Sequence, residues 1–348
     1  MSTFFIEFRD PLFGAILFFV IIFVIAIFSY WFNRYKKRED YKHLDRFLKQ
    51  FNTPVSKEEL YVLITKGELS EKTWLLLAHS FIKNGDYEKA IEIYSELLKV
   101  GNKDNYRDTL FLLGKTYLKA GFLVRSKTIF LEILQNNPRT PQALNYLLLV
   151  YEHMRDYSAA IEILEPLEEL QIETKIQRAY LDAKIILSST EFSVEQKVEK
   201  LLEIYKKDNQ LTYMIFEYIF RVNPKAAWVN LDVSKSGLLL DILWGCDKKD
   251  LNLDIIMSSG YLRELYSAKW YIESEKSSSI FEFDVLINLN KSVNATLSFE
   301  YLCDCCKQVS PFAFHRCSSC HAIDSLRVEF SLAKSYYGDF SEENNSFQ

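Results

Sequence analysis

Four cysteines near the C-terminal end of the sequence have the types and spacing that could do chemistry. They form two C-x-x-C pairs, Cys303 with Cys306 and Cys317 with Cys320, separated by ten residues. A C-x-x-C pair places two thiolates on one tight turn, close enough to share one ion. Two such pairs complete a tetrahedral site with four cysteine ligands. We therefore predict one metal ion ligated by these four cysteines.

A closed site of four cysteine ligands has no open coordination position, so its expected role is structural. We expect zinc in preference to iron, although four cysteines alone accept either metal. Cys305 is directly adjacent to Cys306 in the sequence. A C-x-x-C pair needs two intervening residues, so Cys305 is not expected to replace one of the four ligands. His315 and His321 flank the second pair and are interpreted as neighbours of the site rather than ligands. Cys246 is alone and is interpreted as a buried apolar residue.

Alternating apolar and polar residues flank the four cysteines. LSFEYL precedes the site and LRVEF follows it, and both have the period of a β-strand. The residues between the two pairs, which include Phe312 and Phe314, can form a small hairpin. We predict a small rubredoxin-like or zinc-ribbon β module over 296–335, followed by a polar tail over 336–348.

A repeated pattern begins after residue 70. Trp74, Leu110 and Leu144 are equivalent residues of three similar units, which are 36 and then 34 residues apart. The recurring large and small residues resemble the tetratricopeptide repeat (TPR), a pair of antiparallel helices about 34 residues long. We therefore predict a TPR-like α-solenoid.

Small residues and turn residues in these units fit helix pairs. Small side chains let two helices approach closely, and large ones fill the groove between them. The small residues are Ala78, Ala90, Gly114, Ser126 and Ala160. Gly85 and Gly121 are placed to end the first helix of their units. Arg155 and Asp156 make the same turn in the third unit without glycine, and Pro138 stops a second helix.

The first helix of each TPR unit lines the face on which such arrays bind protein partners. By register, this predicted groove contains Leu75, His79, Ile82, Lys83, Phe111, Lys115, Leu118, Lys119, Asn145, Leu149 and His153. The five apolar members form a stripe, and an exposed stripe would mark a docking groove. The alternative is that other helices or the cysteine module cover it.

An uncharged apolar run lies near the start of the chain. The run 11–32 is long enough to cross the hydrocarbon core of a membrane, about 30 Å, as a helix. A cleaved signal peptide would need a basic start and a small-residue cleavage site, which this segment lacks. Only one cation, Arg9, precedes the run. Four cations follow it closely, namely Arg34, Lys36, Lys37 and Arg38. The positive-inside rule then predicts a single-pass anchor with the N-terminus outside and the rest of the chain in the cytoplasm.

The composition favours a helical binding protein. The chain has 348 residues and a formal net charge of −5, which argues against an electrostatic nucleic-acid binder. Only 10 glycines and 7 prolines interrupt it, as expected for long helices joined by short turns. Since no Gly-rich phosphate loop, H-E-x-x-H motif or nucleophile elbow occurs, we predict that the protein is not an enzyme.

These features predict a mostly α-helical chain with an added β module. The N-terminal segment and anchor occupy 1–33, juxtamembrane and capping helices occupy 34–70, and TPR and TPR-like repeats occupy 71–295. The repeat pattern weakens after residue 170. Further helices are expected over 174–188, 195–206, 211–222, 237–245 and 260–273. The Asp and Glu residues at helical spacing are interpreted as solvated faces.

Together these parts resemble the lipopolysaccharide assembly protein B (LapB) family. LLGKTYLKAGFLVRSKTIFLEIL and the following ALNYLLLVYEHMRDYSAAIEILEPL look like its central repeats. CDCCKQVSPFAFHRCSSC looks like its rubredoxin-type module, although Lys307 stands where a glycine often follows the second cysteine. The resemblance covers roughly 11–170 and 296–330.

The resemblance implies an adaptor of the Gram-negative bacterial inner membrane, with a periplasmic N-terminus. Such adaptors hold the membrane protease FtsH near LpxC, the deacetylase that commits flux to lipid A, and thereby set how fast LpxC is degraded. Two other functions stay open. One is a general membrane-tethered TPR scaffold, which can also form a homo-oligomer. The other is a rubredoxin-like electron carrier, which would contain iron and show a reversible one-electron couple.

Overall fold

The computed structural model describes residue 23 and residues 57–66, 69–100, 105–273, 275–289 and 295–334. The chain divides between Met154 and Arg155 into two compact units. The predicted anchor over 11–32 lies outside the described residues, apart from Phe23, and so does the predicted tail over 336–348. Within the described part of the chain, no helix is both long and apolar enough to cross a membrane.

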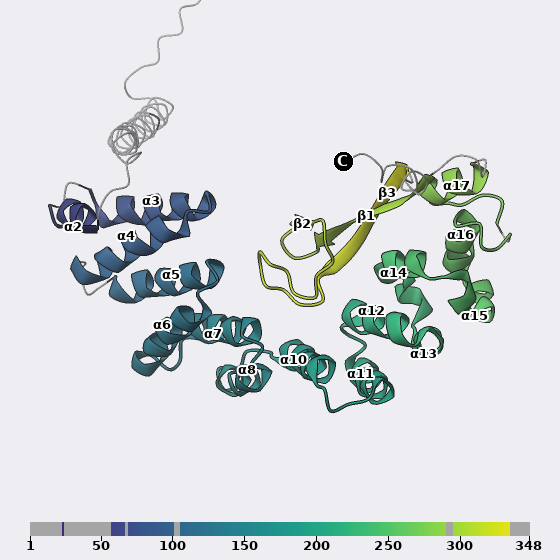
Figure 1. Ribbon diagram of the computed structural model, residues 1–348, viewed down its shortest axis with the longest axis horizontal. Helices are drawn as coiled ribbons and strands as arrows, with labels where there is room; N and C mark the ends of the chain where they lie inside the picture. Colours follow the sequence, from purple (N-terminus) through teal and green to yellow (C-terminus); the bar gives the residue numbers. More distant parts are fainter. Residues whose placement is uncertain are drawn as a thin grey trace, which may run out of the picture. The chain divides into compact units, whose positions relative to one another are not determined.

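The first unit is a stack of helices in chain order (Figure 1). Its described helices are α2 (Lys57–Thr65), α3 (Glu71–Lys83), α4 (Tyr87–Val100), α5 (Tyr106–Lys119), α6 (Leu123–Asn136) and α7 (Pro141–His153). Each helix from α3 to α6 packs against the next one. The first two predicted repeats are therefore the hairpins α3–α4 and α5–α6. The third, α7–α8, spans the boundary between the units.

Small residues allow the paired helices of the first unit to approach closely. A Cβ atom added to Gly114 would lie 2.9 Å from Cγ2 of Ile129 and 3.0 Å from Cζ of Phe130. The hydroxyl of Ser126 is fully buried and donates a hydrogen bond to the carbonyl oxygen of Gly114, 2.9 Å away. The predicted spacing of small residues is therefore confirmed at this crossing, where no larger side chain fits.

The turns between the paired helices follow the sequence prediction. Gly85 and Gly121 have φ angles of 81° and 80°, in the left-handed region that glycine enters without strain. Arg155 occupies the equivalent position of the third repeat with φ 60°. The next residue, Asp156, accepts a hydrogen bond from the backbone N–H of Ala159 at 3.2 Å and so caps α8. The third repeat thus turns without glycine, as predicted.

The second unit contains shorter helices. They are α8 (Tyr157–Glu162), α9 (Leu164–Glu169), α10 (Lys175–Ser188), α11 (Val194–Asp208), α12 (Thr212–Val222), α13 (Pro224–Asn230), η1 (Val233–Leu239), α14 (Leu240–Gly245), η2 (Lys248–Asp250), α15 (Leu253–Ser258), α16 (Gly260–Ala268) and α17 (Phe281–Asn288). The helices expected after residue 170 are present with shifted ends. The helix expected over 260–273 stops at Ala268 because Trp270 adopts φ 57°, outside the helical region.

A three-stranded antiparallel sheet completes the second unit. Its strands are β1 (Ala295–Cys303), β2 (Val309–Ser310) and β3 (Leu326–Lys334), in the order β2-β1-β3. The sheet lies beside the helices of this unit, where Phe330 of β3 stacks on Phe283 of α17 with ring centroids 5.6 Å apart (Figure 1). Both strands predicted from alternation are confirmed. β1 ends at Cys303 and thus positions the first cysteine of the predicted site.

Candidate functional site

The sulfur atoms of Cys303, Cys306, Cys317 and Cys320 form one cluster. All four lie within 4.8 Å of one another. Cys303 Sγ is 3.7 Å from Cys320 Sγ, and Cys306 Sγ is 3.6 Å from Cys317 Sγ. These separations are too long for disulfide bonds. Four sulfurs placed about 2.3 Å from a central ion would be about 3.8 Å apart, so the cluster fits a tetrahedral metal ion.

The first pair of ligands lies on a tight turn at the end of β1. The backbone N–H of Cys303 donates to the carbonyl oxygen of Gln308 at 2.9 Å. The N–H of Lys307 donates back to the carbonyl oxygen of Cys303 at 2.8 Å. Lys307 has φ 59°, so a lysine occupies the left-handed position that the family resemblance assigns to glycine. The turn therefore forms without glycine.

The second pair of ligands lies on the same kind of turn. The N–H of Cys317 donates to the carbonyl oxygen of Ala322 at 2.9 Å, and the N–H of His321 donates to the carbonyl oxygen of Cys317 at 3.0 Å. His321 has φ 61°. The two turns thus share hydrogen bonds and backbone conformation, and they present their sulfurs to each other.

The electrostatics of the cluster favour a bound cation. Burial of Cys303 opposes ionisation, but hydrogen bonds from Ser325 and from the N–H groups of Cys306 and Cys305 lower its pKa to about 6. The N–H of Ala322 lowers the pKa of Cys320, but desolvation and the neighbouring thiols raise it to about 12. The pKa of Cys303 is thus lowered and that of its neighbour Cys320 is raised. A metal ion would supply the missing positive charge.

Cys305 does not belong to the cluster. It is exposed, and its sulfur is absent from the group of four. Of the four clustered cysteines, Cys303 and Cys317 are buried, whereas Cys306 and Cys320 are exposed. The cluster thus opens to solvent on one side.

Polar contacts join the cysteine module to α12 within the second unit. His315 Nε2 lies 2.7 Å from a carboxylate oxygen of Glu217. This hydrogen bond lowers the pKa of Glu217 against the opposing effect of burial. The backbone N–H of Leu211, which has φ 58° just before α12, donates to Asp324 at 3.0 Å. His315 is therefore a contact between the module and a helix, as its interpretation as a non-ligand requires.

Asp241 of α14 connects the sheet and the helices. The hydroxyls of Tyr213 and Tyr301 both donate to its Oδ2 atom, at 2.6 and 2.8 Å. Burial, reinforced by Asp241, raises the pKa of Tyr213 and raises that of Tyr301 to about 12. The interpretation of helical carboxylates as solvated faces is wrong for Asp241 and Glu217. Periodicity does not show which distant strand or loop packs on a helix.

The predicted groove residues differ in their exposure. Leu118 and Leu149 are buried, with 9% and 4% of their surface exposed. Leu75, Ile82, Phe111 and Lys115 are half-buried, and Leu75 and Ile82 pack against the core of the first unit. The exposed members are His79, Lys83, Lys119, Asn145 and His153. Of the two alternatives, the covered stripe agrees with the burial of Leu118 and Leu149 and with the packing of Leu75 and Ile82. The exposed members of the predicted groove are polar or basic.

Aromatic rings link the second and third repeats on this face. Phe111 and Tyr146 meet edge to face, with ring centroids 5.3 Å apart. The ammonium group of Lys115 lies 5.7 Å from the centroid of Phe111 and 5.1 Å from that of Tyr146. Cation–π attraction holds this lysine at one position on the face.

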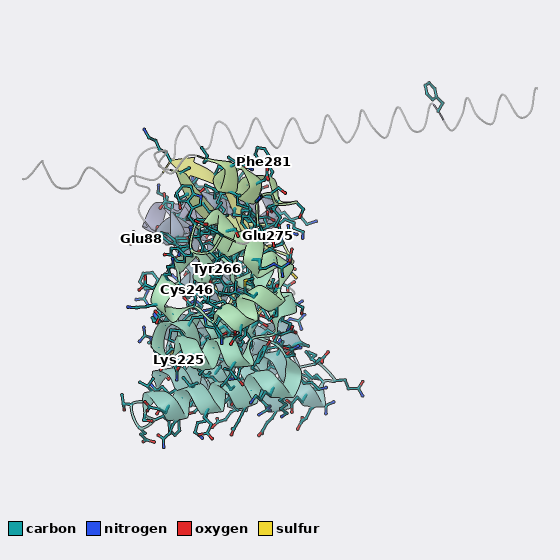
Figure 2. The ribbon with its side chains drawn as sticks, turned by 90° about the vertical axis from the view of Figure 1, so that its right-hand side faces the viewer. Glu88, Lys225, Cys246, Tyr266, Glu275 and Phe281 are labelled. Carbon is teal, nitrogen blue, oxygen red and sulfur yellow. The ribbon has the colours of Figure 1, made fainter. Side chains whose placement is uncertain are left out.

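Cys246 lies apart from the cluster, beside Tyr266 on the face of the second unit seen in Figure 2. Its thiol donates to the carbonyl oxygen of Ile242 at 3.4 Å, and burial raises its pKa to about 11. It is half-buried. Cys246 is therefore less buried than its interpretation as a buried apolar residue requires, although its raised pKa keeps the thiol protonated near neutral pH.

Comparison with known families and proteins places a TPR in this chain. Residues 71–100 match the tetratricopeptide repeat family, and they include α3 and α4. The regulatory protein RapD of Bacillus subtilis (strain 168) is 30% identical over 190 residues, which cover 51% of this chain and 48% of RapD. The TPR repeat-containing protein MJ1428 of Methanocaldococcus jannaschii is 32% identical over 93 residues, which cover 27% of this chain and 14% of that protein. This chain thus spans less than half of the length of either relative.

Solved structures, among them a tetratricopeptide repeat protein, are similar over part of the chain. One from Parabacteroides merdae is 14% identical and covers 62% of this chain and 83% of its own, with a TM-score of 0.38. MamA from Desulfovibrio magneticus RS-1 is 17% identical and covers 46% of this chain and 89% of its own, with a TM-score of 0.35. Identities and TM-scores this low support no conclusion about function.

Proposed function

We propose that this chain is a membrane-tethered TPR adaptor, which binds protein partners through the first helices of its repeats and carries a structural metal ion. The observation that carries the proposal is the face of α3, α5 and α7. Polar and basic side chains are exposed there on helices whose opposite sides are buried in the repeat stack. Repeat arrays use such a continuous face for binding proteins.

The metal ion is proposed to be zinc with a structural role. Four sulfurs close the coordination sphere and leave no position for substrate or water. The residues beside the ligands contact helices of the same unit, as His315 does with Glu217 and Tyr301 with Asp241. The ion would therefore hold the module in the shape that these contacts need. An electron carrier of the rubredoxin type would contain iron instead.

The more specific proposal concerns the membrane and the partners. The apolar run 11–32 and the four cations after it support a single-pass anchor in the bacterial inner membrane, with the repeats in the cytoplasm. The resemblance to the LapB family supports FtsH and LpxC as the proteins that the adaptor connects. RapD is called a regulatory protein, and its partial similarity agrees with a regulatory role for the repeats.

Affinity purification of the full chain from native membranes tests this function. The expected eluate contains FtsH and LpxC, about one zinc ion per chain and no iron. A strain without the chain should show a changed LpxC half-life, measured after synthesis is stopped. A matched variant without 1–33 should leave the membrane fraction on carbonate extraction, while the full chain stays in the pellet.

Three results would contradict parts of the proposal. An unchanged LpxC half-life would rule out the lipopolysaccharide function, and recovery of a different complex would favour a general scaffold. Iron with a reversible one-electron couple would favour the electron carrier. Release of the full chain by carbonate would exclude the anchor.

A further inference from the structure

Three basic residues occupy equivalent positions at one end of the face proposed to bind partners. Lys83, Lys119 and His153 each stand in the last turn of the first helix of a repeat, namely α3, α5 and α7. All three are exposed. They follow one another at 36 and then 34 residues, which is one repeat each time. We name Lys83, Lys119 and His153 the cationic row.

The lysines of the row have no acidic partner among the residues that the structure describes. Ion pairs of the first unit join Lys89 to Asp86 and Lys99 to Glu96, both at 2.7 Å. These pairs lie on the second helix of a repeat or the turn before it. No described carboxylate lies within ion-pair distance of Lys83 or Lys119.

The carboxylates of α3 and α5 lie at the opposite end of these helices. Glu71 and Asp108 stand in their first turns, where Glu71 accepts a hydrogen bond from Asn105 and Asp108 lies 3.9 Å from Arg107. In α7, the acidic residue is the half-buried Glu152. The last turns of α3 and α5 therefore contain a lysine and no carboxylate.

The helix dipole alone does not explain this distribution. A cation in the last turn is favourable for any helix, because carbonyl groups there lack partners. Among the second helices, however, α6 has no basic residue in its last turn, and Lys99 of α4 is neutralised by Glu96. In the last turns of the described helices α3 to α7, exposed basic residues without a described ion pair therefore stand on the first helices of the repeats, where the adaptor would meet its partner.

Lys115 is a further cation close to the row, and both Lys115 and the row member His153 are held in place by described contacts. Lys115 is held over Phe111 and Tyr146, one helical turn before Lys119. His153 Nδ1 lies 2.8 Å from the carbonyl oxygen of Leu149, which leaves Nε2 as the nitrogen without a described hydrogen bond. Positions that are already ordered lose little entropy on binding.

We propose that the cationic row binds an extended acidic segment of a partner protein, with a carboxylate at about every third residue. The helices α5 and α7 contact each other, so Lys119 and His153 are separated by about one interhelical distance, about 10 Å. We infer a similar step from Lys83 to Lys119, because these lysines occupy equivalent positions of successive repeats. An extended chain covers about 3.4 Å per residue, so three residues span that distance. The inference rests on the adaptor function proposed above and specifies the chemistry of its partner.

Fluorescence anisotropy with the full chain in detergent tests this binding. The probe is a fluorescein-labelled peptide of repeated Glu-Ala-Ser, about twelve residues long, and the matched peptide is repeated Gln-Ala-Ser. The Glu peptide should bind at low salt, and the Gln peptide should not compete with it. The double variant Lys83→Gln/Lys119→Gln should bind the Glu peptide about 5- to 10-fold more weakly, because it loses two exposed charge pairs.

The control variant is Lys66→Gln/Arg139→Gln. It removes the same charge from exposed residues that lie outside the three first helices. It should bind the Glu peptide as the parent does. Circular dichroism and metal content of both variants should match the parent, which shows that they fold.

Equal binding of the Glu and Gln peptides overturns the inference. An equal loss of affinity for the Glu peptide in the two double variants also overturns it. A different outcome is that the Lys83→Gln/Lys119→Gln variant binds phosphatidylglycerol vesicles more weakly than the parent but binds the Glu peptide equally well. That result would assign the row to a lipid surface instead of an acidic segment. Recovery of protein partners from native membranes, with no binding of the Glu peptide, would reject the acidic segment and keep the adaptor. Absence of any specific protein partner would reject the adaptor itself.

Discussion

Cys305 and Cys306 are chemically identical neighbours, and backbone geometry separates their roles. The hydrogen bond from Lys307 N–H to the carbonyl oxygen of Cys303 closes a turn that brings Cys306 beside Cys317. Cys305 stays exposed outside the cluster. The spacing rule predicted this difference, because two ligands on one turn need two intervening residues.

Replacing Cys306 should remove the metal, whereas replacing Cys305 should not. A serine oxygen is a poorer ligand than a thiolate for zinc, so Cys306→Ser should lose most of the bound ion. Cys305→Ser should keep about one ion per chain. Metal analysis of the purified full-length variants measures both. Retention by Cys306→Ser together with loss from Cys305→Ser would mean that the turn binds the metal in a different register.

The hydrogen bond from Tyr301 to Asp241 predicts a loss of stability at alkaline pH. Burial, with the bond to Asp241, raises the pKa of Tyr301 to about 12, above the value of about 10 in an unfolded chain. A raised native pKa gives a stabilisation that is complete below pH 10 and is lost as the pH rises from 10 to 12. Tyr301→Phe should therefore be less stable than the parent at pH 8, by about 1 kcal/mol.

The difference between parent and variant should shrink at pH 11, since only the parent loses this contribution. Denaturant unfolding at both pH values gives the two free energies. Tyr61→Phe changes an exposed tyrosine of α2 and is the control. An equal difference between parent and Tyr301→Phe at pH 8 and pH 11 would show that the phenol does not titrate differently in the two states.

Residues of the site were predictable from the sequence only where their spacing is local. The four cysteines lie within one short segment, and metal ligation dictates their pattern. Asp241 and Tyr301 are separated by 60 residues, and Glu217 and His315 by 98. No short pattern links such pairs, because their contact depends on how the sheet packs on α12 and α14.

The turn between the paired helices is made in two ways in the three repeats, with either glycine or arginine at the left-handed position. Gly121 and Arg155 occupy equivalent left-handed positions with φ 80° and 60°. A residue with a Cβ atom is strained there, by about 1 kcal/mol or more, whereas glycine is not. Gly121→Ala should therefore destabilise the fold by about 1 kcal/mol, and Arg155→Gly should stabilise it by up to about the same amount.

Thermal unfolding of the two variants beside the parent measures these opposite shifts. A Cβ atom at Gly121 would meet no other atom within 4 Å, so backbone strain alone is tested there. A lower melting temperature for Arg155→Gly would show that the arginine side chain stabilises the turn by more than its strain costs.

Periodicity predicted the elements well and their surroundings poorly. The repeated spacing of small and large residues located α3 to α7 and the turns between them, because both depend on neighbours along the chain. The same spacing predicted on which side of their helices Leu118 and Leu149 lie. It did not predict which residues cover them, and both are buried. The helix expected over 260–273 extended too far because Trp270 leaves the helical region, which its residue type does not predict.

At the scale of the whole molecule, the cysteine cluster belongs to the second unit. Its described contacts with helices are made within residues 155–334, by Leu211 with Asp324, Glu217 with His315, and Asp241 with Tyr301. The core of the first unit, which includes Trp74, is built from its own helices. A change at the metal should therefore stay within one unit.

Metal removal should loosen the second unit and leave the first intact. Without the ion, the two turns lose their common anchor, so the contacts of α12 and α14 with the sheet weaken. Hydrogen exchange after treatment with a strong chelator should accelerate in α12, α14 and β1 by more than about 10-fold, equivalent to about 1.4 kcal/mol. Exchange in α3 to α6 should not change.

Cys317→Ser should show the same pattern without chelator, and Cys305→Ser should show it only with chelator. Uniform acceleration across both units would mean that the whole fold depends on the metal and that the two units do not respond separately.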